Sequence, residues 1–216
     1  MKKIASPLFQ DLSEAELDTL AAAGHLRTRQ FAKHEVIFHA GSCVREIGIV
    51  LRGSVHIENL DLWGTKSILS SVGAGQAFAE TYAFCGEALM VDAVAAEHCE
   101  ILFLHTAAFT DARIEPALQD KLLRRLLAVS MRKNLSLSQR IFCTTPKTVR
   151  GRLLTYFSAQ AARCGRMAFE VPFNRQQMAD HLNLDRSALS KELCKMRDEG
   201  LLEFDKNRFV LKQLPE

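Results

Sequence analysis

Between residues 29 and 104 the apolar residues form short runs or alternate with polar ones, and glycines separate these runs. Many short strands at spacings of about ten residues favour a jelly roll or a barrel. The pattern predicts strands at Val36–Phe38, Ile47–Leu51, Val55–Ile57, Ser67–Leu69 and Glu100–Leu104. Ahead of them, Ser13 and Glu16 have the spacing of a capping box, which predicts a short helix to about Ala23.

From about residue 107 the apolar residues recur with a helical period. One face of this segment carries the apolar stripe Ile114, Leu118, Leu122, Leu126 and Val129. An uninterrupted helix of this length is typical of a coiled-coil-like dimer seam, so we predict a dimerisation helix. The alternative is a long helix whose stripe packs on its own β-domain. Thr145 is then expected to cap the next helix, with Pro146 at its first position.

Residues 174–196 have the pattern of a helix-turn-helix. Ala179 is the small residue required where two helices touch, and Asn183 stands at the turn, where Asn or Gly favours a left-handed backbone. Asp185 is expected to cap the second helix. Early in that helix come polar side chains of the kinds that read base edges: Arg186, Ser187, Ser190 and Lys191. One departure is Glu192, at a position that is usually apolar.

A β-hairpin is predicted directly after this second helix, with its turn at residues 205–207, and a short strand is predicted at Phe169–Pro172. A strand, a helix-turn-helix and a hairpin in this order make a winged helix. Cationic and polar side chains around such a fold contact DNA phosphates. We expect these contacts from Thr145, Asn174, Arg175, Gln176, Lys206 and Arg208.

The charge distribution agrees with a nucleic-acid-binding last third. Residues 146–216 hold 5 Lys and 8 Arg against 4 Asp and 5 Glu, whereas the 216-residue chain as a whole is only +3. Six scattered cysteines without a C-x-x-C pair indicate reduced thiols rather than disulfides or zinc. No apolar run is long enough for a membrane helix and no secretion signal is evident, so we expect a cytoplasmic protein.

On these residues the sequence resembles the Crp/Fnr family of bacterial transcription regulators. Turns at Gly41 and Gly53 and the segment Gly75–Glu80 are similar to a cyclic-nucleotide-binding β-roll, and the long helix and the helix-turn-helix complete the resemblance. It implies an α+β protein that is not an enzyme: a homodimer that binds inverted repeats in double-stranded DNA, with RNA polymerase as a further partner. The implied domains are an effector-sensing roll over 1–106, a dimerisation helix over 107–143 and a winged helix over 144–216.

The resemblance also bears on the effector. Nucleotide-binding members hold the cyclic phosphate with an Arg-Ser or Arg-Thr pair that follows a Phe-Gly-Glu sequence. Here Met90–Asp92 occupies that stretch and no arginine lies between Arg52 and Arg113, so cyclic AMP is not expected to bind. A pocket for a different ligand would be lined by Phe78, Glu80, Tyr82, Val91 and Asp92. The alternative is that this segment, residues 75–92, which we call the cassette, binds nothing.

The cysteines and histidines indicate which other sensing chemistries the sequence favours. Iron–sulfur members have a cysteine cluster near the N-terminus, whereas the first cysteine here is Cys43, so a cluster is not expected. A haem- or thiol-based gas or redox sensor on the same fold stays the alternative, with Cys43, Cys85 and Cys99 in the roll. The histidines available to haem are His25, His34, His39, His56, His98 and His105. A cupin metalloenzyme typically begins its metal motif with His-x-His, which is absent, so no metal is predicted.

Overall fold

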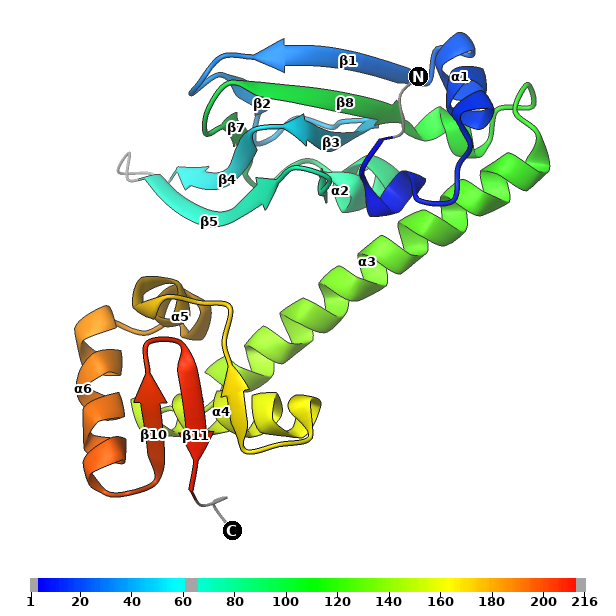
Figure 1. Cartoon of the computed structure of the whole chain (residues 1–216). Helices are drawn as coiled ribbons and strands as arrows, with labels where there is room; N and C mark the ends of the chain where they lie inside the picture. The colour runs from blue at the N-terminus through cyan, green and yellow to red at the C-terminus, as the bar shows by residue number, and fades with distance from the viewer. Residues whose placement is uncertain (1–3, 61–65, 213–216) are drawn as a thin grey trace. The chain divides into compact units, whose positions relative to one another are not determined.

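The computed structural model describes residues 4–60 and 66–212 and has a mixed α+β architecture (Figure 1). It divides into two compact units, Met1–Arg132 and Lys133–Glu216. The division falls inside one long helix, α3 (Pro116–Thr144). In the described part of the chain, no helix is both long enough and apolar enough to span a membrane.

The first unit is built on two antiparallel sheets. Their strand orders are β1-β8-β3-β6 and β2-β7-β4-β5. The strands are β1 (Leu26–Phe31), β2 (Val36–Phe38), β3 (Glu46–Arg52), β4 (Ser54–Leu60), β5 (Lys66–Gly73), β6 (Ala77–Phe78), β7 (Asp92–Ala95) and β8 (Cys99–His105). The helical elements are α1 (Glu14–Ala22), α2 (Glu80–Cys85) and two 3₁₀ turns, Pro7–Phe9 and Thr106–Phe109. The five predicted strands are confirmed within β2, β3, β4, β5 and β8, and the predicted capping box begins α1.

Aromatic side chains fill the space between the two sheets. The ring of Phe38 lies 5.6 Å from that of Phe103 and 5.8 Å from that of Phe78, centre to centre. Gly48 on β3 makes room for Phe78, because a Cβ there would come within 2.2 Å of the Phe78 ring. Gly53 fits a tight turn between β3 and β4, with a φ of +85° that favours glycine. The interior of the roll is therefore a packed core.

The long helix begins later than the sequence pattern suggested. Residues 106–109 form a 3₁₀ turn, and α3 starts only at Pro116, so the prediction of a helix from residue 107 is wrong. Proline suits the first turn of a helix, where its missing N–H is not needed and its φ is already helical. From there the helix runs to Thr144 without a break.

The predicted dimer stripe on α3 is buried inside its own chain. Ile114, Leu118, Leu122 and Leu126 are 2%, 4%, 0% and 6% exposed, and Val129 is half-buried. The four buried residues share a core with Leu8, Leu17 and Leu20 of the N-terminal segment and α1 and with Ile47 and Leu104 of the sheet. Ion pairs from Arg125 to Asp11 and from Lys121 to Glu16 border this contact. The assignment of the stripe to a dimer seam is therefore wrong, and the alternative, packing on its own β-domain, is the observed one.

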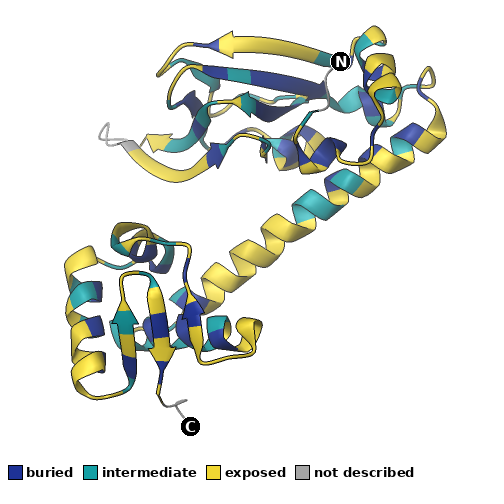
Figure 2. Ribbon diagram, in the orientation of Figure 1, coloured by how far each residue is buried: buried dark blue, intermediate teal, exposed yellow. Residues whose placement is uncertain are grey.

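A different part of α3 is exposed. Every residue from 131 to 142 is exposed, and the ribbon of α3 is mostly yellow over this part of the helix (Figure 2). Large apolar side chains are among these exposed residues. The exposed large apolar residues of α3 are Leu123, Leu127, Met131, Leu135, Leu137, Ile141 and Phe142. They lie away from the stripe that packs on the roll, so α3 has a second apolar face.

The second unit is a three-stranded antiparallel sheet with helices packed on it. Its elements are α4 (Val149–Cys164), β9 (Ala168–Glu170), α5 (Arg175–Leu182), α6 (Arg186–Asp198), β10 (Leu202–Asp205) and β11 (Arg208–Leu211). The strand order is β10-β11-β9. Leu153 and Phe157 of α4, Leu193 of α6 and Phe209 of β11 are fully buried in one shared core.

The link between α3 and α4 corrects one predicted cap. The backbone N–H of Thr145 donates to the carbonyl of Ile141 at 2.9 Å, and its hydroxyl donates to the same oxygen at 2.8 Å. Thr145 thus closes the last turn of α3. The N-cap of α4 is Thr148, whose hydroxyl accepts from the N–H of Gly151 at 3.0 Å. The prediction failed because Thr145 is already bonded within the preceding helix.

Candidate nucleic-acid interface

Helices α5 and α6 form the predicted helix-turn-helix, and their caps explain why. The side chain of Asn174 accepts from the N–H of Gln177, whose side chain in turn accepts from the N–H of Asn174, both at 2.9 Å. Asn183 ends α5 with a left-handed φ of +53°. Asp185 begins α6 by accepting from the N–H of Ala188 at 2.9 Å. The Ser187 hydroxyl and these backbone N–H groups lower the pKa of Asp185, so its carboxylate stays charged at the helix start.

The predicted base-reading residues lie on the outer face of α6. Arg186, Ser187 and Lys191 are exposed and Ser190 is half-buried, whereas Leu189 on the opposite face is fully buried. The Ser187 hydroxyl donates to Asp185. Within residues 4–60 and 66–212, Arg186 and Lys191 form no ion pair. Two uncompensated cations on an exposed helix face are what phosphates and guanine edges attract.

This outer face extends further than the sequence pattern indicated. Cys194 and Lys195 are also exposed, and both follow Lys191 by about one turn of α6. Their spacing from Ser187 and Lys191 could have identified them as members of the same face. The polar surface of α6 thus runs over most of the helix length.

Three of the six predicted phosphate-binding residues lie together. Asn174, Arg175 and Lys206 line a hollow of about 410 Å³ that also includes Pro172, Phe173 and Asn207. The hollow lies where the hairpin turn meets the N-terminus of α5, the end of a helix that favours anions. The Arg175 guanidinium stacks over the rings of Phe204 and Phe209, at 4.9 and 5.1 Å from their centres. Its burial lowers the pKa of Arg175, and the side chain ties α5 to the hairpin.

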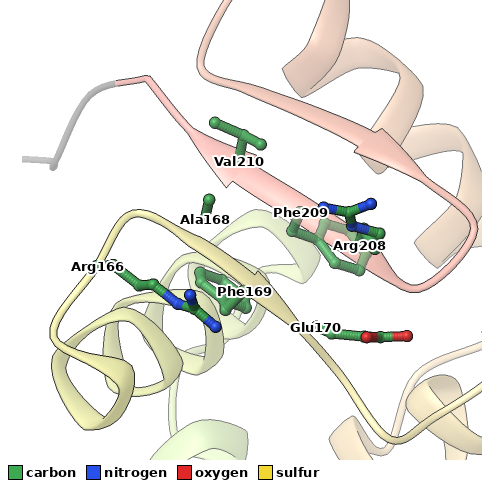
Figure 3. A pocket seen from close by; sticks show the side chains of 7 residues that line it. All are labelled: Arg166, Ala168, Phe169, Glu170, Arg208, Phe209 and Val210. Carbon is green, nitrogen blue, oxygen red and sulfur yellow. The ribbon is translucent and has the colours of Figure 1, made fainter.

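The other three predicted phosphate-binding residues lie elsewhere. Arg208 lines a separate hollow of about 460 Å³ on the β9–β11 surface, together with Arg166 and Glu170 (Figure 3). In the strand register Arg208 of β11 stands opposite Glu170 of β9. The side-chain amide of Gln176 donates to Asp180 at 2.8 Å, and the Thr145 hydroxyl is engaged within α3. The six residues therefore do not form one cluster.

Two arginines that the sequence pattern does not indicate donate hydrogen bonds to the C-terminal end of α5. Arg152 of α4 donates to the carbonyls of Leu182 and Asn183 at 3.1 and 2.7 Å. Arg140 of α3 donates to the carbonyl of Asp180 at 3.2 Å. These carbonyls end α5, where cations are favoured by unpaired backbone oxygens. No local pattern points to such contacts, because the partners are about 30 to 40 residues apart in the chain.

In the roll, the candidate effector residues divide into core and cassette. Phe78 is 3% exposed and belongs to the aromatic core, so its assignment to a ligand pocket is wrong. The Asp92 carboxylate accepts from the N–H of Ala40 at 2.7 Å and joins β7 to the end of β2. Glu80 is buried at the first turn of α2, and Tyr82 and Val91 are half-buried.

Several candidate sensor side chains have structural partners. Nε2 of His25 forms a hydrogen bond with the Asp111 carboxylate at 2.7 Å. The Arg113 guanidinium contacts the same carboxylate and holds the pKa of Asp111 well below its usual range. Nδ1 of His105 accepts from the N–H of Ala107 at 3.0 Å. The buried Cys99 thiol donates to the carbonyl of Ser54, whereas Cys43 and Cys85 are exposed.

Comparisons with known protein families match both halves of the chain. Residues 28–113 match the cyclic nucleotide-binding domain and residues 151–216 match the Crp-like helix-turn-helix domain. The fold and the exposed face of α6 thus define a DNA-binding transcription regulator with a cyclic-nucleotide-binding-like domain. No curated protein matches the sequence.

Solved structures agree with this class over nearly the whole chain. The catabolite activator protein of Thermus thermophilus is 25% identical, with a TM-score of 0.50 over 96% of this chain and 94% of that one. FixK2 of Bradyrhizobium japonicum is 18% identical, with a TM-score of 0.51 over 87% and 93%. CprK complexed with OCPA shares the fold at 12% identity, with a TM-score of 0.62 over 94% and 91%. The chain belongs to the Crp/Fnr family of transcriptional regulators.

Proposed function

We propose that this protein is a homodimeric regulator that recognises an inverted repeat in double-stranded DNA through α6. The observation that carries this proposal is the exposed, uncompensated pair Arg186 and Lys191 on a helix whose other face is fully buried. The Ser190 hydroxyl can donate to or accept from a base edge, and the Ser187 hydroxyl, which donates to Asp185, can still accept. The caps at both ends of the turn hold this face in a fixed orientation relative to α5.

Phosphate contacts position the reading helix in this proposal. Lys206 and Arg175 bring positive charge to the hollow at the N-terminus of α5, which Asn174 also lines. Arg208, Gln176 and Thr145 lie outside this hollow and would contact the flanking backbone. Because these contacts carry little sequence information, they set register and affinity rather than specificity.

The dimer is proposed to form through the second apolar face of α3, with a second copy of this chain as its occupant. Leu123, Leu127, Leu137 and Ile141 are 47%, 56%, 61% and 65% exposed. Their successive spacings of four, ten and four residues fit one heptad, with Leu127 and Ile141 at a positions and Leu123 and Leu137 at d positions. The intervening d position is Ser130, and the pattern extends over nearly three repeats. Asn134 falls at an a position of the same heptad, where a single polar residue favours two strands in one register.

The effector is proposed to be something other than cyclic AMP. The chain has no arginine between Arg52 and Arg113. The buried Glu80 and the half-buried Asp92 bring negative charge to the cassette, which disfavours a cyclic phosphate. A regulator of this family acts where the chromosome is, so we place it in the cytoplasm. RNA polymerase is the further partner that family membership suggests.

A gel shift on the protein's own upstream DNA, repeated over a salt series, tests the DNA-binding function. Specific complexes should form at low salt and weaken steeply as salt rises, because Lys and Arg displace counterions from the phosphates. A matched protein with Arg186 and Lys191 both changed to Ala should lose the specific complex. If the native chain shifts no DNA at low salt, the proposal is wrong and the winged helix binds another partner.

A further inference from the structure

The structure explains the residue at which α6 departs from the helix-turn-helix pattern. Glu192 stands where the pattern has an apolar side chain, next to Lys191 on the reading helix. Its carboxylate accepts from Nε of Arg150 on α4 at 2.6 Å. The same guanidinium reaches Glu199, with Nη2 at 2.9 Å from one carboxylate oxygen and Nη1 at 2.8 Å from the other. One arginine thus binds two carboxylates at or beside α6 that are seven residues apart.

Seven residues are about two turns of a helix, so Glu192 and Glu199 lie on the same side of α6. The planar guanidinium has donors in a rigid fork, which fixes the direction of each contact as well as its distance. The three side chains are partly buried, with 33% of Arg150, 20% of Glu192 and 37% of Glu199 exposed. The contact with Arg150 lowers the pKa of Glu199, so this carboxylate stays charged.

Two carboxylates on a DNA-reading helix need compensation. Uncompensated, they would repel the phosphate backbone. Glu199 also lies at the C-cap of α6, where negative charge is disfavoured by the helix dipole. Arg150 neutralises both disadvantages with a single side chain. It comes from α4, the helix that packs against α6 in the core of this unit.

We propose that Arg150 is a positioning residue for DNA reading, and that its hydrogen bonds and ion pairs with Glu192 and Glu199 fix the rotation of α6 about its own axis. The proposal rests on the proposed DNA-binding function. A base-reading side chain must sit within about 0.5 Å of its productive position, so a small rotation of α6 removes a bidentate contact. Phosphate contacts tolerate the same rotation, because they depend on charge more than on direction.

The test compares specific with non-specific affinity in full-length protein. The native chain first selects its preferred sequence from a randomised DNA library. Affinities for this sequence and for random DNA are then measured with Arg150→Met, which keeps an unbranched apolar stem and removes the guanidinium with its charge. Affinity for random DNA should fall modestly, because Glu192 and Glu199 lose their counter-charge and repel phosphates. Affinity for the selected sequence should fall much further, so that the ratio of specific to random affinity drops at least tenfold. Arg163→Met is the matched control on α4, because Arg163 is exposed and bonds only to Gln160 among the described residues.

A second change separates positioning from loss of fold. The double variant Arg150→Met with Glu192→Leu restores the apolar side chain typical of the pattern, and it should recover most of the lost ratio. Should Arg150→Met prove unstable to heat, Glu192→Gln replaces it and should still lower the ratio several-fold. The proposal is overturned if Arg150→Met behaves as Arg163→Met does, or if it lowers both affinities equally. A native chain that selects no sequence overturns the proposed function instead, and the positioning role with it.

Discussion

At the residue scale, Arg186 and Lys206 are both cations of the second unit, but their surroundings assign them different roles. Arg186 is exposed at the first turn of α6, whereas Lys206 lies in the hairpin turn beside the α5 N-terminus. Arg186→Ala should cost about 1–3 kcal/mol on the preferred DNA sequence and flatten the preference at one base. Titrations of the selected sequence and its single-base variants measure both effects.

Lys206→Ala is the matched comparison and should act on all sequences alike. Removing one phosphate contact lowers affinity uniformly and reduces the slope of log affinity against log salt by about one unit. If Arg186→Ala instead weakened selected and random DNA equally, Arg186 would be a phosphate contact. The assignment of α6 to DNA would stand, but the base-reading role of that residue would not.

Tyr156 is a second residue with a testable consequence. Its hydroxyl is buried, forms no hydrogen bond within the described residues, and burial raises its pKa to about 12. Removing an unsatisfied buried hydroxyl is favourable, so Tyr156→Phe should raise the free energy of unfolding by about 1 kcal/mol. Denaturant unfolding followed by circular dichroism measures this change, and a destabilised variant would show that the hydroxyl has a partner.

The raised pKa also gives Tyr156 a pH signature. An unfolded tyrosine ionises near pH 10, so above this pH the unfolded chain loses a proton that the folded chain retains until about pH 12. Stability should therefore fall as pH rises through this window, by about 1.4 kcal/mol per unit at most. Tyr156→Phe should remove this part of the slope. Equal slopes for both proteins would contradict the buried, neutral phenol.

At the scale of elements, α3 carries two apolar faces with opposite roles. Leu127→Glu combined with Leu137→Glu should give a folded monomer, because both side chains are exposed on the proposed seam. Leu122→Ala should leave the dimer intact but destabilise the first unit by about 2–5 kcal/mol, since Leu122 is fully buried against the roll. Light scattering reports the mass and thermal unfolding reports the stability of each variant.

Comparing the mass and stability of these two variants tests which face of α3 forms the dimer. A Leu127/Leu137 variant that stays dimeric would place the seam elsewhere. A Leu122 variant that becomes monomeric would mean that the buried stripe supports the dimer after all. Arg124→Ala serves as a control, because its exposed ion pair with Asp120 contributes little.

The two faces of α3 show which elements the sequence could predict. Local signals were sufficient for the capping box at Ser13, the cap at Asp185 and the left-handed Asn183, because each depends on neighbours within four residues. The apolar period of α3 predicted a buried stripe but not its partner. A stripe that packs on its own roll and one that packs on another chain have the same spacing. The choice depended on the N-terminal segment about a hundred residues away.

The candidate interface was predictable to a similar extent. The exposed polar residues of α6 followed from helical periodicity, and the structure places them on one face. The role of Glu192 did not follow, because its partner Arg150 lies on another helix, 42 residues earlier in the sequence. Phe78 was assigned to a pocket for a comparable reason. Its position in the cassette was evident from the sequence, but its contact with Gly48 was not.

At the scale of the whole molecule, a two-fold dimer predicts the arrangement of its DNA site. Two copies of α6 should bind half-sites about one helical turn, ~34 Å, apart, in inverted orientation. Insertion of about half a turn, roughly five base pairs, between the half-sites rotates one of them to the opposite side of the duplex. Affinity should then fall toward that of a single half-site. The monomeric Leu127/Leu137 variant should bind weakly and be insensitive to this insertion, because it has no second α6 to misplace. Fluorescence titration of both proteins on both DNAs decides the matter: an insertion that leaves the native chain's affinity unchanged would mean that the two reading helices are not held in one symmetric dimer.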